Sequence, residues 1–316
     1  MGRFRNSLPQ LNGNVYLTDA GLETDLIFNR GIEIPEFAAH TLLGRDKDRE
    51  VVANYLRDFL VVAKEHKTGF ILDTQTWKAH RHWASDLGVT VNELKDVNEE
   101  AVRFISTLRQ EFSENEMPIV LSGVIGPKGD AYAPDAPITA LEAEEYHLEQ
   151  IGWLADTNVD MISAYTFIQA REAIGAVKAA QNHKIPIVIS FTVETDGNLP
   201  SGQSLIDAIC TVDYATDNGA AYFMINCAHP VHFSHLIEHD VVTRRIRGIR
   251  CNASRMSHAE LDCCETLDDG NPVELASQYG GFKSAMNRLN VFGGCCGSDL
   301  RHMKEIANVL VPVANH

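Results

Sequence analysis

The chain has 316 residues, of which 45% are hydrophobic and 22% are charged, as in an ordinary soluble globular protein. Its 27 basic and 43 acidic residues give a formal net charge of −16, which argues against nucleic acids and anionic membranes as partners. No run approaches the ~18 consecutive apolar residues of a membrane-spanning helix. The first residues also lack the apolar core of a signal peptide.

The cysteine content favours a reducing environment. Seven cysteines is an odd number for a disulfide framework, and a chain of this size does not need one. We therefore expect a cytoplasmic protein with free or metal-bound thiols. The oligomeric state stays open, and a homo-oligomer is compatible with the sequence.

Apolar runs typical of strands alternate with helical patterns along the chain. The runs are continuously apolar, as expected for parallel strands buried on both faces. They cover residues 14–18, 69–77, 118–124, 160–165, 185–192, 221–227, 246–251 and 290–294. Helical patterns cover residues 49–66, 91–112, 140–158, 169–182, 204–218, 232–239, 272–289 and 299–310. Thr139 and Glu142 match the capping box of a helix start, whereas residues 252–271 are polar and lack periodicity.

This alternation fits either a (β/α)₈ barrel or a doubly wound open sheet. No Gly-x-Gly-x-x-Gly follows the first strand and no P-loop occurs, so the nucleotide-binding open sheets lose support. No linker or shift in charge divides the chain. We therefore predict one (β/α)₈ barrel domain over residues 1–316.

In such a barrel the carboxyl ends of the strands share one face, where active sites lie. The sixth and eighth strands are close neighbours, so Cys227 can face the vicinal pair Cys295 and Cys296. Neighbouring cysteines do not readily bond to each other. The glycines around the pair indicate a tight exit with little side-chain cover over the sulfurs. Three thiolates on one face would suit zinc or copper(I).

Three cysteines without an evident fourth ligand predict an open, catalytic kind of metal site. A substrate sulfur would suit the open position, because zinc favours a thiolate over a thiol. Three thiolates make the metal a weaker Lewis acid, which favours alkylation of a thiol over hydrolysis. A zinc hydrolase with Asp73 or Glu194 as its base is one alternative. A non-catalytic zinc or thiol sensor is another, with the loop cysteines Cys263 and Cys264 as its reporter.

The other cysteines and the histidines point less clearly to a site. Cys210, within a helical pattern, and Cys251, within a strand, are expected in the core. The histidines of residues 232–239 share a helical face that we expect to be solvated. His229, two residues after Cys227, is the candidate to support that ligand.

Asn226-Cys227 followed by Pro230, together with Gly293-Gly294-Cys295-Cys296-Gly297, resembles the zinc signature of the homocysteine S-methyltransferase family. Further blocks extend the resemblance over nearly the whole chain. They are residues 19–31, similar to the opening Asp-Gly-Gly segment, residues 74–77, similar to a Thr-x-Thr-aromatic element, and residues 123–129 and 189–202.

The resemblance implies a (β/α)₈ barrel that transfers a methyl group to the sulfur of homocysteine and gives methionine. The catalytic zinc ligands that it implies are Cys227, Cys295 and Cys296. The acceptor-binding positions that it implies are Asp19, which would hold the amino group, Ala20, Gly21, Thr74 and Tyr165. Its partners would be a small-molecule thiol acceptor and a methyl donor. With no cobalamin or folate module in the sequence, the expected donor is S-methylmethionine or S-adenosylmethionine, with betaine-type donors as the alternative.

The sequence departs from the family pattern in three places. Ala164-Tyr165-Thr166 stands where the family has a glutamate that helps to hold the acceptor's ammonium group, and tyrosine carries no full charge at neutral pH. Asp-Gly-Gly becomes Asp19-Ala20-Gly21, and Arg250-Cys251-Asn252 replaces Tyr-Pro-Asn. A different small thiol is therefore the alternative acceptor.

Overall fold

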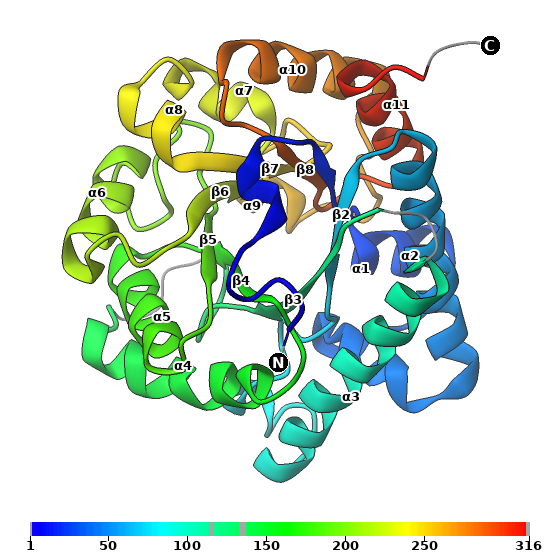
Figure 1. Cartoon of the computed structure of the whole chain (residues 1–316), viewed down its shortest axis with the longest axis vertical. Coiled ribbons are helices and arrows are strands. Elements are labelled where there is room, and N and C mark those ends of the chain that lie inside the picture. The colour runs from blue at the N-terminus through cyan, green and yellow to red at the C-terminus, as the bar shows by residue number, and fades with distance from the viewer. Residues whose placement is uncertain (1, 114–116, 133–136, 314–316) are drawn as a thin grey trace.

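The computed structural model describes residues 2–113, 117–132 and 137–313. Its strands form a closed parallel barrel in which each strand pairs with its sequence neighbours and β1 pairs with β8, with helices around the outside (Figure 1). The predicted (β/α)₈ fold is confirmed. The strands are β1 Tyr16–Leu17, β2 Gly69–Asp73, β3 Ile119–Ile125, β4 Met161–Phe167, β5 Ile187–Phe191, β6 Tyr222–Asn226, β7 Ile246–Cys251 and β8 Val291–Gly294.

The long helices agree with the predicted periodic segments, and the Thr139–Glu142 capping box is present. They are α2 Asp46–Glu65, α3 Val91–Glu111, α4 Ala140–Ala155, α5 Ala170–Asn182, α6 Leu205–Thr216, α10 Pro272–Ala285 and α11 Leu300–Leu310. The short ones are α1 Leu22–Thr24, α7 Pro230–Phe233, α8 Asp240–Arg245 and α9 His258–Leu261. Within the described ranges, no helix has the length and apolarity to cross a membrane.

Two short elements differ from the sequence prediction. The expected helix over residues 232–239 is not continuous: α7 ends at Phe233, a 3₁₀ turn covers Ser234–Leu236, and α8 begins only at Asp240. Both helices start at a histidine whose side chain accepts a backbone N–H, His229 from Val231 and His239 from Val241, so each histidine caps a new helix. The polar stretch 252–271 contains α9, which is too short to show a period.

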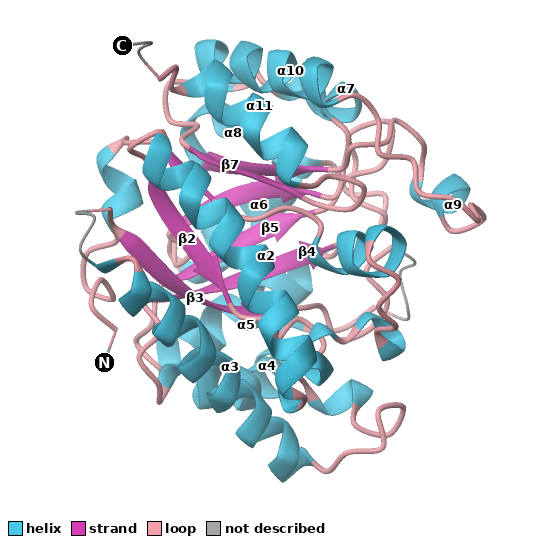
Figure 2. Ribbon diagram, turned by 90° about the vertical axis from the view of Figure 1, so that its right-hand side faces the viewer, coloured by secondary structure: helices cyan, strands magenta, loops and turns pink. Residues whose placement is uncertain are grey.

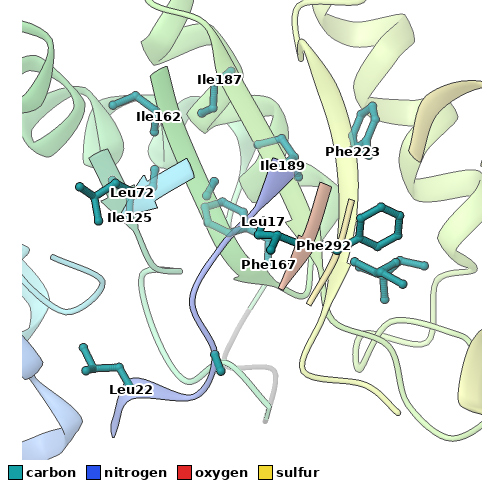
Figure 3. Close-up of a cluster of buried hydrophobic side chains, with 14 of the residues drawn as sticks. Leu17, Leu22, Leu72, Ile125, Ile162, Phe167, Ile187, Ile189, Phe223 and Phe292 are labelled. Atoms are coloured by element: carbon teal, nitrogen blue, oxygen red, sulfur yellow. The ribbon is translucent and has the colours of Figure 1, made fainter. Parts of the chain in front are cut away.

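Side chains of the strands alternate between the barrel interior and the layer under the helices. The outer layer is an apolar core that includes Leu17, Leu72, Ile125, Phe167 and Phe292 (Figure 3). The interior is filled by a second cluster, formed by Leu8, Tyr16, Ile71, Val120, Val124, Met161, Tyr165, Val188, Tyr222, Met224 and Val291. The barrel is therefore packed solid below its mouth.

The N-terminal segment covers one end of the barrel (Figure 1). Leu8 joins the interior cluster, and Gln10 donates Nε2–H to Tyr222 Oη at 3.3 Å. Asn290, just before β8, donates to the Gln10 carbonyl at 2.7 Å. The chain termini lie on this side, whereas α9 lies beyond the carboxyl ends of the strands (Figure 2). Access to the interior is therefore from the carboxyl ends.

Of the two cysteines expected in the core, one is buried and the other is exposed. Cys251 on β7 is fully buried, as predicted. Cys210 on α6 is exposed, and that prediction is wrong. The buried side of α6 is formed by Leu205, Ala208, Ile209, Val212 and Thr216, and Cys210 falls outside that stripe.

Candidate metal centre

Three cysteines meet at the open mouth of the barrel. Cys227 follows β6 directly, and Cys295 and Cys296 follow β8. Their sulfur atoms all lie within 4.8 Å of one another, and Cys227 Sγ is 3.5 Å from Cys296 Sγ. Cys227 is buried, while the other two are partly exposed. In the described part of the chain, no other cluster of three such ligand side chains has this geometry.

The spacing of the sulfurs fits a tetrahedral zinc ion. Two thiolates bound at 2.3 Å around a tetrahedral centre would be about 3.8 Å apart, close to the spacing found here. Hydrogen bonds from Cys295 and Cys296 lower the pKa of Cys227 well below its usual value. The thiolate of Cys227 in turn raises the pKa of Cys295 to about 12. A divalent cation held by all three sulfurs would favour the thiolate form of each.

The backbone of Cys227 is in a left-handed conformation, with φ +55°. A residue with a Cβ atom rarely adopts this region, and such strain is concentrated at functional sites. Asn226 supports the turn, since its Oδ1 accepts from the N–H of Thr166 at 3.0 Å and from Ser190 Oγ at 2.6 Å. The end of β6 is thereby tied to β4 and β5, which fixes the direction of the Cys227 sulfur.

His258 holds the carbonyl of Cys227. Its Nε2–H donates to that oxygen at 2.7 Å, and its Nδ1 lies 3.1 Å from Glu194 Oε1. The ring of Tyr132 packs on His258 at 4.5 Å, and the Tyr132 hydroxyl lies 3.0 Å from Cys227 Sγ. Neither His258 nor Tyr132 was predicted from the sequence. The predicted supporting residue, His229, caps α7.

Glycine is required where the first strand meets the cysteine loop. A Cβ atom on Gly21 would lie 2.5 Å from the carbonyl oxygen of Cys295, so any side chain there would displace the loop. Gly297 has φ +76°, which allows the turn after Cys296. The predicted tight exit after β8 is present, and it leaves both sulfurs partly uncovered.

A cavity of about 530 Å³ opens above the cysteines. It contacts every site residue predicted from the sequence: Asp19, Ala20, Gly21, Thr74, Tyr165, Cys227, Cys295 and Cys296. Its wall also includes the aromatic residues Phe28, Phe37, Trp77, Trp83 and Tyr132, together with Lys78. The Lys78 ammonium lies 3.7 Å from the centre of the Trp83 ring. The exposed pair Cys263 and Cys264 lies outside the three-cysteine cluster.

Arg250 on β7 organises the polar wall of this cavity. Its Nη2 donates to Asp19 Oδ1 and its Nη1 to Asp73 Oδ2, both at 2.6 Å. The Tyr165 hydroxyl donates to the same oxygen of Asp73 at 3.0 Å. Burial raises the pKa of Asp73 to about 6, against the opposing effect of Arg250. Burial alone would lower the pKa of Arg250, but the carboxylates of Asp19 and Asp73 raise it well above its usual value.

The hydroxyl of Thr74 is used within the protein. It accepts the Val124 N–H at 2.9 Å and lies 2.6 Å from the hydroxyl of Thr76. Thr76 in turn donates to the Val124 carbonyl at 2.6 Å. Thr74 therefore links β2 to β3 beneath the cavity floor.

Known proteins resemble this chain in sequence and in fold. The family model described as homocysteine S-methyltransferase matches residues 16–310. The chain is also similar to crystal structures of the homocysteine methyltransferase MmuM from Escherichia coli. The oxidized form is 16% identical, with a TM-score of 0.72 over 92% of this chain and 94% of that chain. The metallated form is 16% identical, with a TM-score of 0.71 over 93% and 96%. At this identity, the structural likeness shows the fold.

Proposed function

The chain belongs to the homocysteine S-methyltransferase family, and we propose on that basis that it is a zinc-dependent thiol methyltransferase. Its acceptor would be homocysteine, its donor the sulfonium S-methylmethionine or S-adenosylmethionine, and its product methionine. The observation that carries the proposal is the meeting of the Cys227, Cys295 and Cys296 sulfurs within 4.8 Å. These three residues are the proposed zinc ligands. The free state of all seven cysteines supports a cytoplasmic location, and the proposed product would place the enzyme in methionine biosynthesis.

Zinc bound to three thiolates would keep the acceptor sulfur in its thiolate form at neutral pH. In the reaction, the bond between methyl carbon and donor sulfur breaks, and its electron pair stays on the donor. The donor leaves as a neutral thioether, a new bond joins the methyl carbon to the acceptor sulfur, and the thiol proton is lost to solvent. The residues of the cavity contribute by holding both substrates in line above the cysteines.

The aromatic wall of the cavity supports an onium donor. Phe28 and Phe37 line the cavity and are 45% and 46% exposed, and Trp77 and Trp83 line it as well. Cations bind to the faces of such rings, and Lys78 already does so at Trp83. A betaine-type donor would use the same rings, so the wall favours an onium without choosing between sulfur and nitrogen.

Hydrolysis is disfavoured because its candidate bases are engaged. Asp73 accepts hydrogen bonds from Arg250 and Tyr165, and Glu194 lies in contact with His258. Glu194 does not line the cavity, and the second oxygen of Asp73, Oδ1, is buried, so neither carboxylate is well placed to deprotonate a water molecule there. Methyl transfer needs no such base once the acceptor is a thiolate.

Metal analysis and a donor screen test the proposal. Wild-type protein purified under reducing conditions should contain about one zinc per chain. Cys295→Ser should lose it, and the matched control Cys210→Ser should keep it, because Cys210 is exposed on α6 and does not line the cavity. Homocysteine and a panel of methyl donors, followed by mass spectrometry, should give methionine. A metal-free wild type would overturn the zinc assignment, and no methyl transfer from any donor would overturn the activity.

A further inference from the structure

We propose that Arg250 takes the place of a substrate ammonium group, so that the site accepts small thiols without an amino group at least as well as homocysteine. The inference rests on the proposed function, methylation of a thiol at the three cysteines. It concerns which acceptors the polar wall of the cavity selects.

The position of Arg250 follows from the alternation along β7. Ile249 and Cys251 pack in the outer core, so Arg250 between them points into the barrel. Its neighbour across the ladder is Gly293 on β8, where an added Cβ would lie 3.1 Å from Arg250 Cγ. The absence of a side chain at Gly293 makes room for the arginine stem. The residue reaches the cavity wall and is 8% exposed.

All five N–H groups of the guanidinium have partners within the chain. Nη2 donates to Asp19 Oδ1 and, at 3.4 Å, to the Ala20 carbonyl. Nη1 donates to Asp73 Oδ2 and, at 3.4 Å, to the Tyr165 hydroxyl, and Nε donates to the Gly294 carbonyl at 3.1 Å. Arg250 therefore has no donor left for a substrate carboxylate. Its positive charge is paired with the carboxylates of Asp19 and Asp73.

Each aspartate is thus bound to Arg250 through one of its oxygens before any substrate arrives, and the other oxygen of Asp73, Oδ1, is buried without a hydrogen-bond partner in the described part of the chain. Asp19 is the position that the family resemblance assigns to the acceptor's amino group, and a tethered cation already lies 2.6 Å from its Oδ1. A substrate ammonium placed beside Asp19 would compete with that guanidinium and would also be repelled by it. Tyr165, in place of a glutamate, adds no further negative charge to attract an ammonium. An acceptor without an amino group neither competes with the guanidinium nor is repelled by it.

This arrangement predicts an unusual response to removal of the amino group. A site that depends on a substrate N–H leaves buried polar groups unpaired when that group is missing, and rejects the analogue by about 10⁴–10⁵-fold. Here Arg250 keeps Asp19 and Asp73 paired in either case. The loss of the amino group should therefore cost little.

The test compares homocysteine with 4-mercaptobutanoate, which differs from it by the amino group alone. With zinc-loaded wild-type protein and one common donor, kcat/KM for 4-mercaptobutanoate should equal or exceed that for homocysteine. A preference for homocysteine beyond the error of the assay would overturn the inference. If neither thiol is methylated by any donor, the proposed function has failed. Calorimetric binding of both thiols without a donor then applies the same criterion to their affinities.

Substitutions of Arg250 test whether this residue sets the selectivity between the two thiols. Arg250→Met leaves Asp19 and Asp73 without their cation, so the selectivity should shift toward homocysteine by tenfold or more. Arg250→Lys keeps a positive charge and should retain the wild-type selectivity. Asp19→Asn provides a readout if Arg250→Met does not fold, because it should change kcat/KM for the two thiols by the same factor. A selective loss of homocysteine turnover in Asp19→Asn would show that Asp19 binds the ammonium and would contradict the inference.

Discussion

Replacement of Cys227 by glycine and by alanine separates backbone strain from loss of the thiol, because both variants lack the sulfur. At φ +55°, residue 227 occupies the left-handed region. This conformation costs a residue with a Cβ atom about 1–2 kcal/mol, and glycine adopts it freely. The greater freedom of glycine in the unfolded chain offsets about 0.5–1 kcal/mol of that gain. Metal-free Cys227→Gly should therefore be more stable than Cys227→Ala by about 0.5–1 kcal/mol.

Cys251 provides the matched control. It is equally buried, but it ends β7 in an ordinary strand conformation. There the glycine variant should be less stable than the alanine variant, by about 0.5–1 kcal/mol. Urea unfolding of the four chelator-treated variants, followed by circular dichroism, measures both differences as shifts in midpoint. If glycine is the less stable choice at residue 227 as well, the backbone there is not strained.

Three further predictions concern stability and the cysteine loop. Burial lowers the pKa of His40 to about 4, so the unfolded state takes up its proton first and stability falls as pH drops from 6.5 toward 4. The loss should be about 2 kcal/mol at pH 5, and urea titrations of His40→Gln should show a flatter pH profile. Gly21→Ala should weaken zinc binding at least tenfold in a chelator competition, because its Cβ meets the Cys295 carbonyl, whereas Gly44→Ala, which meets nothing within 4 Å, should not. Tyr279→Phe should destabilise the protein by about 2 kcal/mol in urea unfolding, since it leaves a buried N–H and carbonyl unpaired. Those groups are the Cys251 N–H, which donates to the Tyr279 hydroxyl, and the Gly293 carbonyl, which accepts from it. An unchanged unfolding midpoint would show that other groups replace the hydroxyl as hydrogen-bond partner.

The fold was predictable because its strands and helices differ strongly in periodicity. Continuous apolar runs mark buried parallel strands, and each is followed by a helix with a clear apolar face. The alternation also places Cys227 and the pair after β8 at one mouth, where the structure brings the sulfurs together. Short elements were missed, since α9 and the division between α7 and α8 depend on capping by single side chains.

The residues that hold the cysteines and the aspartates of the site in place could not be predicted from local sequence patterns. Arg250 appeared in the sequence as a departure from a family motif, but its partners Asp19 and Asp73 are 231 and 177 residues away. His258 lies in a polar stretch without periodicity, and Tyr132 lies in the loop after β3. Their contacts with Cys227 arise from the meeting of separate loops. Only the closed barrel makes these residues neighbours.

The pairing between β1 and β8, which closes the barrel, affects where the protein opens locally. Strand β1 pairs through Tyr16 and Leu17 alone, so this seam is the place where we expect local opening to begin. Directly beyond it, the Gly294 N–H bonds to the Asp19 carbonyl, and the cysteine loop follows. Opening of the seam would break this bond, which holds one side of the cysteine loop, so we expect release of a metal and local opening to be coupled. Amide hydrogen exchange at Tyr16 and Thr18 should then be slow in zinc-loaded protein and faster after chelation. Equal rates would show that the seam and the metal centre move independently.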